Sequence, residues 1–183
     1  MRLSLTVLLS AFATCSFGQR APADAPARVL SICAVLAEIP AYRGKTIAIR
    51  GVYTYDGLRQ DDCSSEFVTG DHHWPPVLNL VLSDYPDGEK LPVGFTTDVR
   101  SWRNLATTAI EAGRQGRSVE IWATIIGLLR ARKEYVRPGG AVSGGFGHLG
   151  VLPAEIVIER VVDVRVKPVE NSRYDYRLKP KAM

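Results

Sequence analysis

The three histidines, His72, His73 and His148, are the side chains whose chemistry would be most specific if they came together. Imidazole is a common ligand of zinc and copper, and carboxylates such as Asp61 or Asp62 could complete such a site. Neighbouring residues of a strand point to opposite faces, so His72 and His73 could share a metal only within a loop. This group leaves a metal-dependent hydrolase open as an alternative function, with metal binding as the weaker interpretation.

Aromatic and basic residues interleave in two segments that could instead bind an anion. Aromatic rings stack on planar or sugar groups, and guanidinium groups neutralise negative charge. The predicted ligand-facing residues are Tyr53, Tyr55 and Arg59 in the first segment, and Arg130, Arg132, Lys133, Tyr135 and Arg137 in the second.

Motifs for catalysis or cofactor binding are not recognisable in the sequence. The segment 139–150 contains six glycines, but it lacks the Lys-Ser/Thr pair of a phosphate-binding loop and precedes a strand pattern rather than a helix. Ser143 and the Ser64-Ser65 pair lack the context of a nucleophile elbow. The sequence therefore favours a non-enzymatic binding module, and no catalytic residue and no cofactor are predicted.

The N-terminus is typical of a secretory signal peptide, with Arg2 followed by an eleven-residue apolar run and then small residues. We expect cleavage after Gly18 and an exported, periplasmic or extracellular protein. Cys15 could suggest a lipid anchor, but Phe12 and Thr14 stand where lipid-attachment signals usually have Leu and a small residue. The run is also shorter than the roughly 20 residues that span a bilayer, so no transmembrane segment is predicted in the mature chain.

Export also decides how the cysteines are interpreted. Removal of the signal leaves Cys33 and Cys63, and two cysteines in an exported protein predict one disulfide. In the loop-entropy model a closed loop of this size stabilises the fold by about 3 kcal/mol.

The net charge of +4 is concentrated at the end of the chain. Residues 167–183 carry a net charge of +3, whereas residues 19–166 are balanced with 17 basic and 17 acidic side chains. A balanced, exported domain does not fit nucleic-acid binding. The predicted partner is an anionic glycan or a protein of the cell envelope.

A long strand pattern runs from Lys45 to Tyr55, where apolar and polar side chains alternate. Gly51 in its middle permits a sharp bend, and Asp56-Gly57 is a strong hairpin signal. A long strand that bends at a glycine before a hairpin is typical of a small barrel.

The other elements complete a recognisable order. We expect a helix over 27–39 with Ser31 as its N-cap and Pro40 as its end, and a helix over 97–112 capped by Thr96 or Thr97. Further strands are predicted over 58–68, 77–82, 118–130 and 154–166. Three strands, a helix and two strands predict a mainly β, OB-like five-stranded barrel with a short N-terminal helix and one helix between strands 3 and 4.

Several short sequences also resemble a group of small exported bacterial proteins, mostly uncharacterised, that are thought to be OB-fold-like. They are Cys33-Ala-Val-Leu, Tyr42-Arg-Gly-Lys, Ile49-Arg-Gly51 and Gly145-Phe-Gly-His-Leu-Gly150. The resemblance covers most of residues 30–166 and implies a fold but no activity. The expected organisation is a signal peptide over 1–18, a linker over 19–27, the barrel domain over 28–167 and a basic flexible tail over 168–183.

Overall fold

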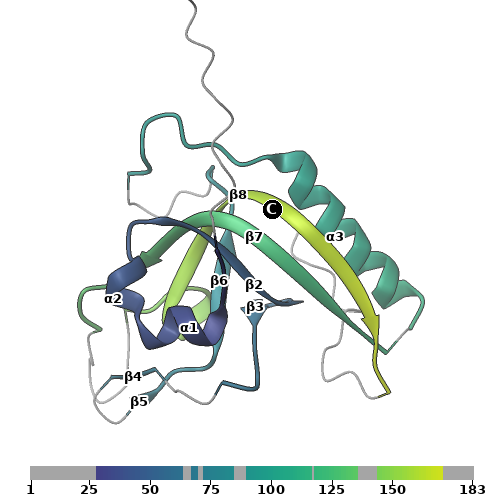
Figure 1. Cartoon of the computed structure of the whole chain (residues 1–183), viewed down its shortest axis with the longest axis horizontal. Helices are drawn as coiled ribbons and strands as arrows, with labels where there is room; N and C mark the ends of the chain where they lie inside the picture. The colour runs from purple at the N-terminus through teal and green to yellow at the C-terminus, as the bar shows by residue number, and fades with distance from the viewer. Residues whose placement is uncertain are drawn as a thin grey trace, which may run out of the picture.

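The structure is a computed structural model that describes residues 28–63, 67–69, 72–84, 90–116, 118–135 and 144–170, without the side chain of His148. The predicted signal peptide, the linker and most of the tail lie outside these residues. The described chain is mainly β and forms a closed five-stranded barrel with few helices (Figure 1).

The barrel has the strand order of an OB fold. Its strands are hydrogen-bonded in the circular order β2–β3–β6–β8–β7–β2, in which β6 and β8 run parallel and the other pairs are antiparallel. The strands are β2 (Thr46–Thr54), β3 (Gly57–Arg59), β6 (Val77–Val81), β7 (Val119–Ala131) and β8 (Ala154–Pro168). The predicted fold class is therefore confirmed, with the last segment forming one long strand.

The N-terminal segment differs from the single predicted helix. A short strand β1 (Val29–Ser31) pairs in parallel with β2, and the helices α1 (Ile32–Ala37) and α2 (Ile39–Tyr42) follow. The Ser31 hydroxyl accepts the N–H of Ala34 at 3.1 Å, so the predicted N-cap is confirmed. The expectation that Pro40 ends a helix was wrong, because it lies in the first turn of α2, where its missing N–H costs no hydrogen bond.

The second predicted strand is also shorter than expected. β3 ends at Arg59, and the following chain forms a separate hairpin of β4 (Val68–Thr69) and β5 (His72–His73). Between them Cys63 forms the predicted disulfide with Cys33, with 5.2 Å between the two Cα atoms. The disulfide fastens α1 to the segment that leaves the barrel.

Helix α3 (Val99–Arg114) is attached to the barrel through irregularities of β8. Register shifts in the β7–β8 ladder free backbone groups of β8 from β7. The carbonyl of Glu159 accepts the N–H of Asp98 at 2.7 Å, and the Thr97 hydroxyl donates to the carbonyl of Ile158 at 2.6 Å. Asp98, not Thr96 or Thr97, is the N-cap, because its carboxylate accepts the N–H groups of Arg100 and Ser101. Thr97 instead holds the helix start against the barrel.

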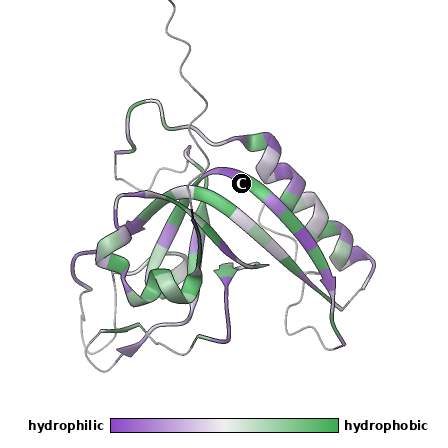
Figure 2. Ribbon diagram, in the orientation of Figure 1, coloured by the Kyte–Doolittle hydropathy of each residue, from purple (hydrophilic) through white to green (hydrophobic). Residues whose placement is uncertain are grey.

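The interior is filled by aliphatic side chains from every barrel strand and from one face of α3. Figure 2 shows hydrophobic residues along much of β7 and alternating hydrophobic and hydrophilic residues along α3. Trp102, Leu105, Ala109 and Ala112 supply the buried face of the helix. Apolar residues at helical spacing thus close the barrel at this side.

Candidate functional site

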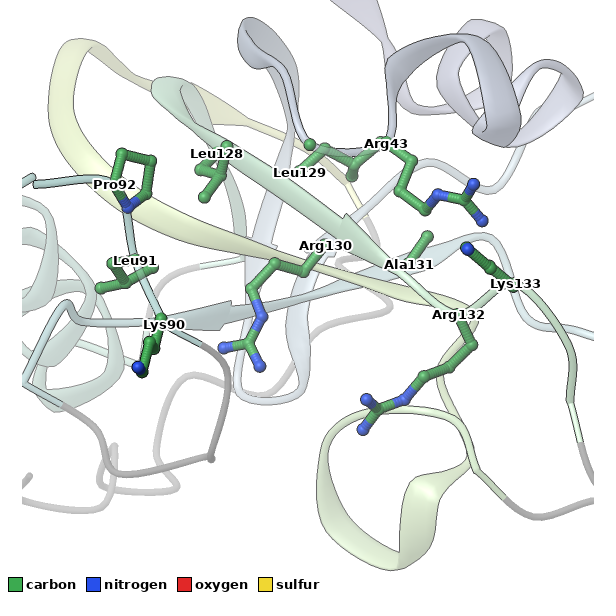
Figure 3. Close-up of a pocket in the computed structure, with 11 residues that line it drawn as sticks. Arg43, Lys90, Leu91, Pro92, Leu128, Leu129, Arg130, Ala131, Arg132 and Lys133 are labelled. Carbon is green, nitrogen blue, oxygen red and sulfur yellow. The ribbon is translucent and has the colours of Figure 1, made fainter.

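A hollow of about 590 Å³ opens where β7 ends (Figure 3). Among the residues that the structure describes, its lining contains five basic residues and no acidic one. The lining residues are Arg43, Gly44, Lys90, Leu91, Pro92, Leu128, Leu129, Arg130, Ala131, Arg132 and Lys133. We refer to this site as the basic hollow; its volume lies in the usual range for small-ligand sites, about 300–1,000 Å³.

Strand alternation divides the basic residues into two groups. Leu129 belongs to the main core, whereas its neighbour Leu128 faces outward and packs in a separate cluster with Val81 and Val157. Arg130 and Arg132 continue the outward face of β7, and Lys90 lies on the same side in Figure 3. Arg43 and Lys133 lie on the other side of the strand end, near one another in that view.

The loop before α3 forms one wall of the basic hollow. Leu91 and Phe95 pack on the outward cluster that contains Leu128. The loop is closed at its base because Ser83 and Thr97 each donate a backbone N–H to the other's hydroxyl, at 2.9 and 3.0 Å. Lys90 and Pro92 are thereby placed beside Arg130.

A row of polar side chains, two of them buried, holds Arg130 at the base of the hollow. Arg130, Glu155 and Asn79 are direct neighbours across β7, β8 and β6. Arg130 Nη1 lies 3.0 Å from Glu155 Oε1, an ion-pair contact rather than an aligned hydrogen bond, and Asn79 Nδ2 donates to Glu155 Oε2 at 3.1 Å. The Glu155 side chain is buried, so the positive charge of Arg130 is balanced within the protein.

Arg132 connects the basic hollow to the glycine-rich loop. Its Nε donates to the carbonyl of Gly144 at 3.2 Å, and its guanidinium carbon lies 4.6 Å from the centre of the Phe146 ring. Phe146 is buried, so this ring is a fixed support for the guanidinium group.

Tyr135 lies in an aromatic cluster that borders this loop, since the Trp74 ring lies close to Gly145. Its ring is 4.7 Å from Trp74 and 5.8 Å from Phe67, and its hydroxyl donates to the carbonyl of Pro153. Burial raises the pKa of the Tyr135 phenol, against a smaller lowering by the nearby Arg132. Tyr135 therefore supports the loop that carries Arg132, and it does not line the hollow.

The first predicted ligand segment does not join the basic hollow. Antiparallel pairing places Thr46 opposite Leu128 and Val52 opposite Trp122, so the end of β2 lies about 30 Å along the ladder from the end of β7. The two segments therefore do not form one site, because β2 and β7 point in opposite directions.

The individual residues of that first segment have other roles. Tyr53 is buried in the core, with its ring 5.9 Å from that of Trp102, so the prediction that it faces a ligand was wrong. Arg59 forms an ion pair with Asp61, and Tyr55 is exposed. Arg137 lies outside the described residues. Of the eight predicted ligand-facing residues, Arg130, Arg132 and Lys133 line the hollow.

The histidines are described only in part. His72 and His73 form β5, and the His72 ring contacts Trp74 edge-on at 4.7 Å between ring centres. Within the described residues, no group of three or more His, Cys, Asp or Glu side chains could hold a metal ion. The side chain of His148 lies outside the description.

Arg43 and Lys90 were missed by sequence reasoning. Arg43 stands before Gly44 in a turn, and the backbone N–H of Gly44 bonds to the carbonyl of Leu129 at 2.8 Å. Lys90 follows a turn-rich segment that has no periodic pattern. A pairing register between β2 and β7 would have identified Arg43, whereas no local signal marks Lys90.

Comparison with known proteins gave no match to a family model, to a curated protein or to a solved structure. The resemblance to exported OB-fold-like proteins therefore stays a prediction from the sequence. In the part of the chain that the structure describes, no helix is both long and apolar enough to cross a membrane.

Proposed function

We propose that the protein is an exported, non-enzymatic binding module of the cell envelope that holds an anionic ligand in the basic hollow. The observation that carries this proposal is the lining itself, in which five basic side chains and, among the described residues, no acidic one surround an apolar patch of Leu91, Pro92 and Leu128. Glu155 forms an ion-pair contact with Arg130, and the other basic residues of the described lining are Arg43, Lys90, Arg132 and Lys133.

An anionic glycan of the cell envelope fits this site. Carboxylate or sulfate groups match the fork of an arginine, and the apolar wall can contact a sugar ring. The two arginines are held in place, Arg130 by Glu155 and Arg132 by Gly144 and Phe146, so less conformational entropy is lost on binding. No described feature favours the metal-dependent hydrolase over this function.

Retention on an immobilised sulfated glycan tests the proposal. The double substitution Arg132→Glu and Lys133→Glu should abolish salt-sensitive retention, because both side chains are exposed and line the hollow. Arg103→Glu with Arg114→Glu on α3 is the matched control, since it makes the same change of charge on exposed residues outside the hollow. Equal retention of both variants would reject the basic hollow as the binding site.

A further inference from the structure

The basic hollow surrounds the end of β7 from two sides. In Figure 3 the side chains of Lys90 and Arg130 lie on one side of this strand end, and those of Arg43 and Lys133 lie on the other, near one another in that view. Arg132 continues the outward face of Arg130, because strand neighbours alternate in direction. We refer to Lys90, Arg130 and Arg132 as the first basic group, and to Arg43 and Lys133 as the second basic group.

The two basic groups differ in their surroundings. Leu91 packs on the outward cluster that contains Leu128, and Figure 3 shows both residues and Pro92 on the side of the first basic group. A charged sugar fits there, since its ring can contact the aliphatic residues while its acidic group meets a guanidinium. The second basic group offers two exposed cations and suits an acidic substituent.

Backbone hydrogen bonds fix the second basic group against the strand that carries the first. The N–H of Gly44 donates to the carbonyl of Leu129 at 2.8 Å, and the N–H of Leu129 donates to the carbonyl of Lys45 at 3.0 Å. Arg43 directly precedes this pair of bonds, and Arg130 directly follows Leu129. The backbone positions of the two arginines are therefore set relative to each other before a ligand binds.

The phenol of Tyr135 lies close to an arginine of each basic group. Burial raises the pKa of this phenol, and the nearby charges of Arg132 and Arg43 lower it by less. Since the effect of a charge falls with distance, both guanidinium groups approach the same phenol. The two basic groups are therefore close enough for one short chain molecule to reach both.

The charges of the second basic group are not balanced within the described protein. Neither Arg43 nor Lys133 forms an ion pair with another residue that the structure describes. Like charges that gather at one site repel, and an anion that binds between them relieves the repulsion. A single sulfate or phosphate can neutralise one basic group but leaves the other as it was.

We propose that the two basic groups are consecutive subsites for one linear glycan that carries an acidic group on successive sugars. The inference rests on the proposed anion-binding function and names its ligand class, a polyanionic chain rather than a single anion. One charged sugar lies on the first basic group and the apolar residues, and the acidic group of the next sugar lies between Arg43 and Lys133. Because the first contact holds the chain near the second subsite, the second contact forms as an intramolecular step and adds affinity.

Titration with sulfated sugars of different length, followed by backbone amide shifts, tests the inference. The probes are N-acetylglucosamine 6-sulfate and a heparin-derived tetrasaccharide, at an ionic strength where charges on different faces of the protein are screened from each other. The wild-type protein should bind the tetrasaccharide at least about tenfold more tightly than the monosaccharide. The monosaccharide should shift Leu91 and Leu128, which line the side of the first basic group.

Neutral substitutions separate the two subsites. Arg43→Gln with Lys133→Gln should leave the affinity for the monosaccharide unchanged and should remove most of the gain from chain length. Lys90→Gln with Arg132→Gln is the matched variant, because it removes two positive charges from the first basic group and should weaken binding of both probes. Arg103→Gln with Arg114→Gln on α3 makes the same change of charge outside the hollow and should alter neither affinity.

The outcomes also separate this inference from the proposed function. Equal affinity of the wild-type protein for the two probes, or a full gain from chain length in the variant of Arg43 and Lys133, would overturn the two subsites and leave the anion site intact. Inorganic tripolyphosphate that binds as tightly as the tetrasaccharide would overturn the glycan as the ligand class. Absence of salt-sensitive binding for every probe would instead overturn the proposed function itself.

Discussion

Arg130 and Glu155 stand directly opposite each other on β7 and β8, with 3.0 Å between Nη1 and Oε1, on the outward face of the barrel. Both side chains are nevertheless buried, because the outward face is covered around them. The pair thus places a fixed guanidinium at the floor of the basic hollow.

Glu155→Gln should destabilise the fold by about 3 kcal/mol, because it leaves the charge of Arg130 buried without its partner. Replacing both residues, as in Arg130→Met with Glu155→Met, should restore most of the free energy of unfolding. Urea denaturation of the three proteins measures this difference. A single substitution that costs less than about 0.5 kcal/mol would show that the pair is not coupled as the geometry indicates.

Gly127→Ala should destabilise the barrel by about 2 kcal/mol or more, because an added Cβ would lie 2.4 Å from the Val157 carbonyl oxygen. The control is Gly116→Ala, where φ is +59° and no atom lies within 4 Å of the added Cβ. Gly116→Ala should lower the free energy of unfolding by only about 1 kcal/mol, the cost of a left-handed conformation in a residue with a Cβ atom. Thermal unfolding of both variants separates steric overlap of the added Cβ from backbone strain. Equal losses of stability in the two variants would argue against close packing at Gly127.

Reduction of Cys33–Cys63 should lower the free energy of unfolding by about 3 kcal/mol, since the two residues are 30 apart in sequence. The Cys33→Ala, Cys63→Ala double variant should match the reduced protein and should not respond to reductant. Denaturation with and without dithiothreitol measures the effect. An unchanged midpoint for the wild-type protein would mean that the link contributes nothing to stability.

The buried phenol of Tyr53 should make the folded protein less stable at alkaline pH. Burial raises the pKa of its phenol to about 12, from an ordinary value near 10, so the folded state favours the protonated phenol. The resulting stabilisation is complete below pH 10 and disappears as the pH rises to about 12, with an upper limit of about 2–3 kcal/mol. Tyr53→Phe should remove this part of the pH dependence in unfolding experiments between pH 9 and about 12. An identical slope in the variant would contradict the shift.

The strand order could be predicted from the sequence because alternation, the Asp56-Gly57 turn and the α3 stripe are local signals. The disulfide could likewise be predicted from the sequence, because it contains an export signal followed by two cysteines. The sequence does not predict the N-terminal strand β1 or the short length of β3. The pairing of β1 with β2, and the point at which the chain leaves the barrel after β3, depend on tertiary contacts.

The candidate site could be predicted only in part, for a similar reason. The Arg130–Lys133 sequence is conspicuous in the chain, but Arg43 and Lys90 reach it from distant segments. Tyr53 was assigned to a surface because alternation identifies two faces without saying which is buried. Closure of the barrel determines which face is buried, and the Tyr53 ring on that face lies against Trp102.

Backbone amide shifts during titration with a sulfated oligosaccharide test the central claim most directly. We predict shifts at Gly44, Leu91 and the segment 128–133, which line the basic hollow. These shifts should decrease with added salt and disappear in the Arg132→Glu, Lys133→Glu variant. Shifts confined to Tyr55 and Arg59 near the end of β2, or no shift at low salt, would contradict the account.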